Sequence, residues 1–220
     1  MNRRLQMSCM VGCLLVLGFG QASSAPVEGT DLVVTVANEE AFKGKGTDAE
    51  FPSLIEVKVG DRVTKMSALG SGVRKKAIFK VYEAVAYADE SAAFHGDPYP
   101  ALLGGSIAMR VVMYFVRDVG AGKIQGAWED GFKKYEGDDT SALSETERST
   151  FISLFNVDMK KEQTIELTWL PDIGFFIVIA DQPRPVLENQ TLATAVFSNW
   201  FGDKPISKGL KKDLVRFVSD

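Results

Sequence analysis

The sequence has few of the residues that most often carry redox, nucleophilic or metal chemistry. Its two cysteines, Cys9 and Cys13, both lie in the first 25 residues, and its single histidine is His95. If the first 25 residues are removed, the chain keeps no thiol, which excludes a disulfide, a cysteine nucleophile and a cysteine-ligated metal. His, Asp and Glu do not recur at the spacing of metal ligands, so we expect neither a metal site nor a cofactor.

Two remaining candidates for catalytic or phosphate chemistry are weak. His95 lies in a polar turn beside Gly96. A single histidine without an orienting partner is typical there of a solvated surface, and not of a general base. Residues 120–123, GAGK, lack the earlier glycine and the following serine or threonine that a phosphate-binding loop requires. The sequence therefore indicates no nucleotide site.

Long apolar runs are absent after residue 25, which excludes a later helix that crosses a bilayer. The segment before that point begins with Arg3 and Arg4, continues through a short apolar run at 14–20 and ends in small residues. This pattern is typical of a secretory signal peptide and is too short for the alternative, a membrane anchor. We therefore expect a signal peptide at 1–25, a single mature domain at 26–220 and a periplasmic location.

Acidic residues outnumber basic ones in the expected mature chain. The whole sequence has 25 lysines and arginines against 29 aspartates and glutamates. Removal of the signal segment takes two arginines and no acid, and leaves a formal charge of −6. This balance argues against nucleic acid and against an anionic membrane surface as general partners.

The spacing of apolar residues predicts strands first and helices mainly later. Extended chain is expected over residues 31–37, 53–59, 62–88, 106–118, 163–170 and 174–180. Helices are expected over residues 118–136, from a capping box at Ser144–Glu147 onward, and over 186–202 and 207–218. In the last helix Leu210, Leu214 and Phe217 are expected to face inward. Residues 106–118 are apolar on both alternating faces, which indicates a strand covered on both sides. The order predicts an α+β fold with an antiparallel sheet.

Two polar residues stand in apolar surroundings and are candidates for a binding site. Arg74 lies in GSGVRKKAIFKVY, residues 70–82, after two glycines and before a β-prone run. An arginine held under a sheet needs an anion or a polarised carbonyl, because it does not lose its proton. The alternative is a solvated surface position. Asn199 shares a helical face with apolar residues such as Leu192 and Val196, and needs either a ligand or a backbone partner.

Three segments together resemble one family. They are LGSGVRKKAIFKVYEAVAYAD at 69–89, AWEDGF at 127–132 and LENQTLATAVFSNWFGDKPISKGLKKDL at 187–214. The sequence is similar over residues 50–218 to the chalcone isomerase family, in its bacterial chalcone isomerase-like branch. The resemblance implies an open-faced β-sandwich, in which a large antiparallel sheet carries a layer of helices and a ligand cleft lies between the two.

The enzymes of this family and their non-enzymatic relatives imply different roles for the cleft. In the plant enzymes, the arginine that matches Arg74 helps the substrate to cyclise, a threonine matches Tyr82 and a polar residue matches Asn199. Their catalytic tyrosine and asparagine fall near Ile124 and Gly131, so that pair is missing here. Non-enzymatic plant relatives bind fatty acids through an arginine and a tyrosine that hold the carboxylate.

The resemblance thus leaves three functions open. The first is a periplasmic protein that binds a fatty acid or similar small apolar carboxylate through Arg74, with Tyr82 or Tyr87 as a second donor and Asn199 in the cleft. The second is an isomerase acting on a chalcone-like or other enone substrate, with Arg74 catalytic. The third is a structural or interaction protein whose cleft is filled by its own side chains. The incomplete enzyme set favours binding.

Overall fold

The computed structural model describes residues 31–136 and 143–218, and the expected signal peptide lies outside them. The strands are β1 (Leu32–Val36), β2 (Ala41–Lys43), β3 (Glu50–Pro52), β4 (Leu54–Val59), β5 (Arg62–Lys76), β6 (Phe79–Asp89), β7 (Met109–Phe115), β8 (Thr164–Leu170), β9 (Gly174–Ile179) and β10 (Gln182–Pro183). The helices are α1 (Tyr99–Leu103), α2 (Ala121–Glu136), α3 (Glu145–Ser153), α4 (Gln190–Phe201) and α5 (Lys208–Asp213). Within these ranges no helix is both long and apolar enough to cross a membrane.

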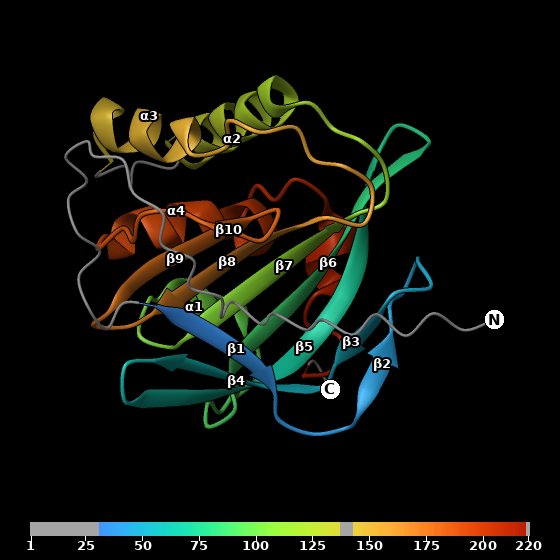
Figure 1. Cartoon of the computed structure of the whole chain (residues 1–220), viewed down its shortest axis with the longest axis vertical. Coiled ribbons are helices and arrows are strands. Elements are labelled where there is room, and N and C mark those ends of the chain that lie inside the picture. The colour runs from blue at the N-terminus through green and yellow to red at the C-terminus, as the bar shows by residue number, and fades with distance from the viewer. Residues whose placement is uncertain (1–30, 137–142, 219–220) are drawn as a thin grey trace, which may run out of the picture.

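Eight of the strands form one curled antiparallel sheet in the order β1-β4-β5-β6-β7-β8-β9-β10, while β2 and β3 pair separately. Figure 1 shows α2, α3 and α4 layered over one side of this sheet, and the hairpin of β5 and β6 extending beyond its neighbours at the upper right. This arrangement confirms the predicted α+β fold, a large antiparallel sheet with a layer of helices.

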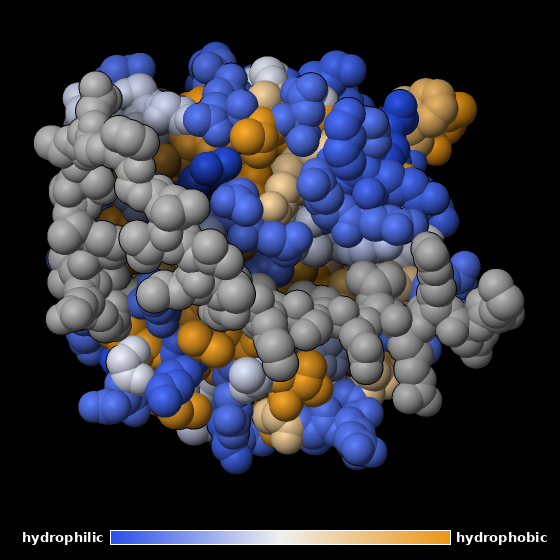
Figure 2. All heavy atoms as spheres, in the orientation of Figure 1, coloured by the Kyte–Doolittle hydropathy of each residue, from blue (hydrophilic) through white to orange (hydrophobic). Residues whose placement is uncertain are grey.

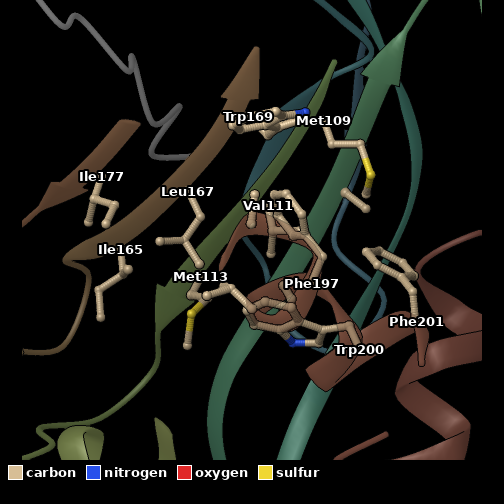
Figure 3. Packing of buried hydrophobic residues seen from close by; sticks show 14 of the residues in the cluster. Met109, Val111, Met113, Ile165, Leu167, Trp169, Ile177, Phe197, Trp200 and Phe201 are labelled. Carbon is tan, nitrogen blue, oxygen red and sulfur yellow. The ribbon is translucent and has the colours of Figure 1, made fainter. Parts of the chain in front are cut away.

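Alternation along the central strands sends side chains to two buried faces. All residues of β7 are buried, as the sequence predicts for a strand covered on both sides. On the helix-covered face, β6 contributes small alanines at 84, 86 and 88, which let the helices approach closely. Figure 3 shows Phe197 and Trp200 of α4 beside Val111 and Met113 of β7. The main core therefore lies between the sheet and α4.

The helix layer has two tiers. α4 packs on the sheet, and α2 packs over α4 and against α3. Trp128 of α2 lies edge-on against Phe151 of α3 and Trp200 of α4, with ring centroids 5.2 and 5.9 Å away. The predicted capping box begins α3: the Ser144 hydroxyl accepts from the Glu147 N–H, and the Glu147 carboxylate accepts from the Ser144 N–H.

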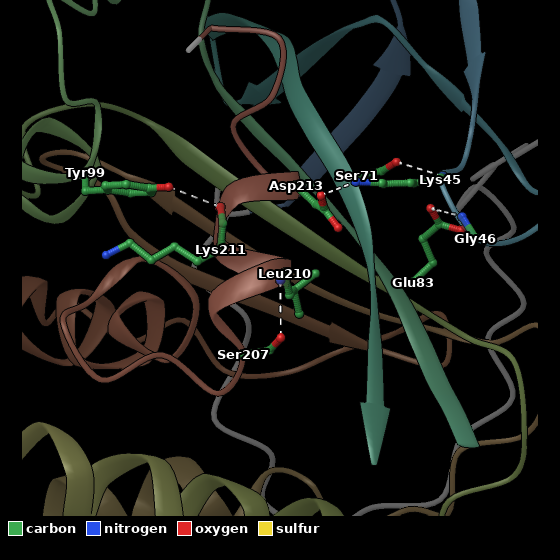
Figure 4. Close-up of polar contacts among 9 residues, drawn as sticks. All are labelled: Lys45, Gly46, Ser71, Glu83, Tyr99, Ser207, Leu210, Lys211 and Asp213. Atoms are coloured by element: carbon green, nitrogen blue, oxygen red, sulfur yellow. Dashed lines mark hydrogen bonds and ion pairs between the residues drawn. The ribbon is translucent and has the colours of Figure 1, made fainter. Parts of the chain in front are cut away.

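The last helix, α5, lies directly on the backbone of β5. Its cap is Ser207, whose hydroxyl accepts a hydrogen bond from the Leu210 N–H at 3.3 Å (Figure 4). A Cβ added at Gly70 would lie 2.4 Å from the Asp213 carbonyl oxygen, and one at Gly72 would lie 2.6 Å from the Asp213 Cβ. The glycines of GSG therefore permit close backbone approach, and a β-bulge falls just before Gly70.

The face away from the helices buries charged groups that apolar periodicity does not predict. Glu83 of β6 is fully buried, and its carboxylate accepts a hydrogen bond from the Gly46 N–H at 3.4 Å (Figure 4). Arg110 of β7 donates to the Thr168 hydroxyl at 2.6 Å and forms an ion pair with Glu166. These contacts satisfy the charges inside the sheet layer, as buried ions require.

Two expectations are wrong where the chain changes direction. The extended run predicted for residues 62–88 is interrupted by a turn at Ala77, which adopts φ of 53° although it is not glycine. The last helix ends at Asp213, and Phe217 is 48% exposed instead of facing the core. The Phe217 N–H donates to the Leu69 carbonyl at 2.9 Å, which draws this segment toward β5 and sets the Phe217 ring edge-on against Phe42.

Gly70→Ala should destabilise the fold by about 1–3 kcal/mol, because the added Cβ meets α5 backbone and forces the helix away from β5. The matched control is Gly122→Ala on α2, where an added Cβ meets nothing within 4 Å. It should be neutral or stabilising by up to about 1 kcal/mol. Urea denaturation measures both free energies of unfolding, and an unchanged value for Gly70→Ala would contradict the direct packing of α5 on β5.

Candidate functional site

Arg74 lies on the helix-covered face of the sheet. The alternation that turns Gly70 and Gly72 toward α5 turns Arg74 to the same side, where it pairs in register with Tyr82 of β6. Arg74 is half-buried, and its Nη1 donates to the Lys75 carbonyl at 2.6 Å. Among the residues that the structure describes, no carboxylate pairs with it. Its remaining N–H groups are therefore available to an anion.

Tyr82 is buried beside Arg74, and its hydroxyl accepts a hydrogen bond from Trp200 Nε1 at 3.2 Å. Burial raises the pKa of Tyr82 to about 12, against smaller lowering effects of the Trp200 hydrogen bond and the Arg74 charge. The hydroxyl is therefore protonated across the physiological range. Within the described part of the chain no acceptor takes its hydrogen, so Tyr82 can donate to a ligand.

A cavity of about 580 Å³ lies between this part of the sheet and the helices α2 and α4. Its size is within the range of small-molecule sites. Its apolar wall comes from the ends of β6 and β7, the start of α2, the end of α4 and the segment after it. The apolar residues that line it are Phe79, Val81, Met113, Phe115, Val119, Ile124, Ala127, Trp128, Trp200 and Ile206. Arg74, Tyr82 and Asn199 all line the same cavity.

Charged side chains gather at the cavity rim. The basic ones besides Arg74 are Lys76, Arg117, Lys123 and Lys134, and the acidic ones are Asp118, Glu129 and Asp130. Asp118 is already engaged with Lys160, at 3.2 Å, and with the Lys161 N–H. The rim is thus polar, the interior is apolar, and the half-buried Arg74 stands between the two. This arrangement suits a ligand with an anionic head and an apolar body.

Asn199 is buried on α4, and part of its hydrogen-bonding capacity is already used within its own helix. Its Nδ2 donates to the Val196 carbonyl of its own helix at 2.9 Å. Its Oδ1 lies against α2, where a Cβ added at Gly131 would be 2.0 Å away. The amide nitrogen of Asn199 is therefore satisfied by the backbone, as the alternative to ligand binding predicts. The place of Asn199 in ligand binding stays a prediction.

The structure separates the two tyrosines that the sequence leaves open as partners of Arg74. Tyr82 pairs with Arg74 and lines the cavity, whereas Tyr87 belongs to the opposite face of the sheet. The Tyr87 hydroxyl donates to the Pro52 carbonyl at 3.1 Å, and burial raises its pKa. Tyr87 does not line the cavity, because it lies five residues from Tyr82 on one strand, and an odd spacing reverses the face.

Two tryptophans of the site are missed by the sequence reasoning. Trp128 and Trp200 line the cavity, and the Trp128 Nε1 is buried without a hydrogen-bond partner in the described chain. Trp128 recurs at helical spacing with Ile124 and Phe132, and this spacing predicts only that it lies on an apolar helix face. His95 is exposed in its loop and does not line the cavity. In the ranges that the structure describes, no cluster of three or more His, Cys, Asp or Glu side chains could hold a metal.

A curled antiparallel sheet with a helix layer and a cavity between them defines a cleft-bearing open-faced β-sandwich. The family model of chalcone isomerase-like proteins matches residues 48–215, and the chain belongs to this family. The expected family is thus confirmed, while its bacterial branch stays a prediction. The crystal structure of a fatty-acid binding protein of Arabidopsis thaliana has the same fold, with a TM-score of 0.59 and 21% identity, covering 80% of this chain and 96% of that chain. No curated protein sequence matches the chain.

The raised pKa of Tyr82 predicts a loss of stability at high pH. The unfolded state releases the tyrosine proton near its ordinary pKa of 10, whereas the folded state keeps it to about 12. The contribution is therefore complete below about pH 10 and is lost as the pH rises toward 12. Between about pH 9 and pH 12, wild type should lose on the order of 2–3 kcal/mol more unfolding free energy than Tyr82→Phe. Urea denaturation at both pH values measures this, and a difference independent of pH would contradict the burial of the hydroxyl.

Proposed function

We propose that this chain binds a fatty acid or a similar small apolar carboxylate in the cavity between the sheet and the helices. The observation that carries the proposal is the pairing of Arg74, which has no carboxylate partner in the described chain, with the protonated Tyr82 at the wall of an apolar cavity. The relative in Arabidopsis thaliana is a fatty-acid binding protein, which supports the same ligand class.

The two donors differ in what they supply to a carboxylate. The Arg74 guanidinium is always charged and offers parallel N–H groups that fit both carboxylate oxygens. The Tyr82 hydroxyl adds a neutral donor, which Trp200 Nε1 holds in place from α4. Half-burial of Arg74 removes part of the competing water, so the charged contact is stronger than at a fully exposed site.

The apolar wall of the cavity contacts the apolar body of the ligand. Met113 and Phe115 of β7, Ile124 and Trp128 of α2, and Trp200 of α4 line the space beyond the donors. Burial of an alkyl chain against such a wall is favourable by about 0.8 kcal/mol for each methylene. The open cavity also argues against the third hypothesis, a cleft filled by its own side chains.

The isomerase alternative lacks part of its chemistry at this site. Cyclisation of a chalcone needs donors that face the charge developing on the enone oxygen. By the family resemblance, the enzymes' tyrosine and asparagine fall near Ile124 and Gly131, and neither of these side chains carries a donor. Each lost donor of this kind costs about 10²–10³ in rate. We therefore propose binding in place of catalysis.

We also propose that the first 25 residues are a signal peptide and that the mature protein acts in the periplasm. The support is the charge and apolar pattern of residues 1–25. N-terminal sequencing of the mature protein tests this directly, with Pro26 as the expected first residue and an intact Met1 as the contradicting result.

Arg74→Ala should weaken fatty-acid binding while leaving the fold intact. Loss of a partly buried charged contact costs on the order of 2–5 kcal/mol, or roughly 30-fold or more in affinity. Arg74→Lys should recover little, because lysine lacks the paired N–H geometry. Isothermal titration calorimetry with a soluble medium-chain fatty acid measures the three affinities.

The matched control for this measurement is Arg62→Ala. Arg62 lies at the other end of β5, is exposed and donates to the Pro171 carbonyl at 3.0 Å, far from the cavity lining. It should bind the fatty acid as wild type does. Equal affinities for wild type and Arg74→Ala would remove Arg74 from the site. Stereoselective cyclisation of a hydroxylated chalcone by wild type, lost in Arg74→Ala, would establish the isomerase instead.

A further inference from the structure

The turn at 77–78 joins β5 to β6, and together with the adjoining strand ends it forms residues 74–80, hereafter the hairpin tip. The hairpin tip exposes two large apolar side chains. Ile78 is 84% exposed and Phe79 is 57% exposed, the highest values among the large apolar residues that the structure describes. Figure 1 shows this hairpin extending past the rest of the sheet, and Figure 2 shows a hydrophobic patch at the same place. A contiguous apolar patch on a projecting element is a candidate interaction surface.

Basic side chains surround this apolar pair. The hairpin tip holds Arg74, Lys75, Lys76 and Lys80, and it contains no acidic residue. Lys75 and Lys76 are exposed, and the Lys80 ammonium is bonded to a neutral backbone carbonyl, that of Gly46, at 2.6 Å. Arg117 follows the end of β7, and its guanidinium carbon lies over the Phe79 ring, 5.1 Å from the ring centroid. The tip is therefore locally positive on a protein whose net charge is negative.

The hairpin tip is continuous with the rim of the cavity. Arg74, Lys76 and Phe79 belong to the tip and also line the cavity, whereas Ile78 and Lys75 belong to the tip alone. On this side of the cavity the lining residue Phe79 is itself exposed, and Ile78 precedes it in the chain. The same element thus connects the interior of the protein with whatever surface the tip contacts.

We propose that the hairpin tip docks the protein on the surface of an anionic lipid bilayer. Two apolar side chains on a turn fall far short of the roughly 800 Å² that each partner contributes to a stable protein interface. They do suit shallow insertion at the level of lipid headgroups, while the basic side chains remain with anionic phosphates. The acidic net charge opposes other orientations and so favours contact through the tip.

Docking at this place brings the cavity rim to the membrane, so that a fatty acid can pass between the bilayer and the cavity. This transfer of a fatty acid between bilayer and cavity rests on the proposed function, but docking on the bilayer does not. The local charge also refines the expectation from the net charge of the chain. The net charge argues against general attraction of this protein to an anionic membrane. The proposed contact is instead confined to one basic element, the hairpin tip.

Co-sedimentation with lipid vesicles tests the proposal. Wild-type mature protein should bind vesicles of phosphatidylcholine and phosphatidylglycerol in equal parts, bind pure phosphatidylcholine more weakly, and lose binding as salt rises. Ile78→Asp should lower the affinity about tenfold or more, because it removes an inserted side chain and adds a negative charge. Lys75→Gln should lower it about fivefold.

Matched variants separate docking from ligand binding. Val63→Asp makes the same change of charge at an exposed aliphatic residue of β5, distant from the tip in sequence, and should bind vesicles as wild type does. Tyr82→Phe should keep vesicle binding and lose fatty-acid affinity, measured without vesicles. Ile78→Asp should show the reverse.

Three results would overturn the docking proposal. The first is no binding of wild type to anionic vesicles at low salt. The second is equal vesicle binding by wild type, Ile78→Asp and Lys75→Gln. The third is an oligomer of wild type that Ile78→Asp dissociates without any change in vesicle binding, which would make the tip an interface between copies of the chain. Failure of fatty-acid binding with vesicle binding retained would count against the proposed function alone.

Discussion

The contact between α5 and the backbone of β5 sets the geometry on which the cavity depends. It requires strand positions without side chains, and Gly70 and Gly72 supply them. The strand alternates, so the next residue on that face is Arg74. α5 covers the glycines, and the cavity opens at the arginine. One steric requirement thus places a permanent charge at the edge of the helix layer, opposite Tyr82 of the neighbouring strand.

The site combines aromatic side chains that hold one another in place with donor groups of Arg74 and Tyr82 that have no acceptor in the described chain. Tyr82 is held by Trp200, and Trp200 by the ring of Trp128, so the polar donor is fixed from both helices above it. Burial keeps its hydroxyl protonated, because the charged phenolate would be poorly solvated. By contrast, the charges on the other face of the sheet, such as Glu83 and Arg110, have protein partners. Arg74 has no carboxylate partner in the described part of the chain, and this difference supports the proposed binding role over a structural one.

Much of the fold follows from sequence pattern, since antiparallel hairpins, the Ser144 capping box and the covered strand β7 all have local signals. The turn at Ala77 has none, because no glycine, proline or asparagine marks it. Arg74 could be identified from its apolar setting and from the family resemblance. Its partner required the register of β6, although the odd spacing of Tyr82 and Tyr87 already places them on opposite faces. The tryptophans and the Arg110–Glu166 pair depend on packing between distant segments, which periodicity does not encode.

We propose that Arg74 and Tyr82 hold a carboxylate while the cavity holds its apolar chain. A crystal structure of the mature protein with a fatty acid brominated at its terminal carbon tests it most directly. We expect carboxylate oxygens within hydrogen-bond distance of the Arg74 guanidinium and the Tyr82 hydroxyl. We also expect anomalous bromine density among the apolar residues that line the cavity. Density for the ligand outside the cavity, or a carboxylate bound away from Arg74, would contradict it.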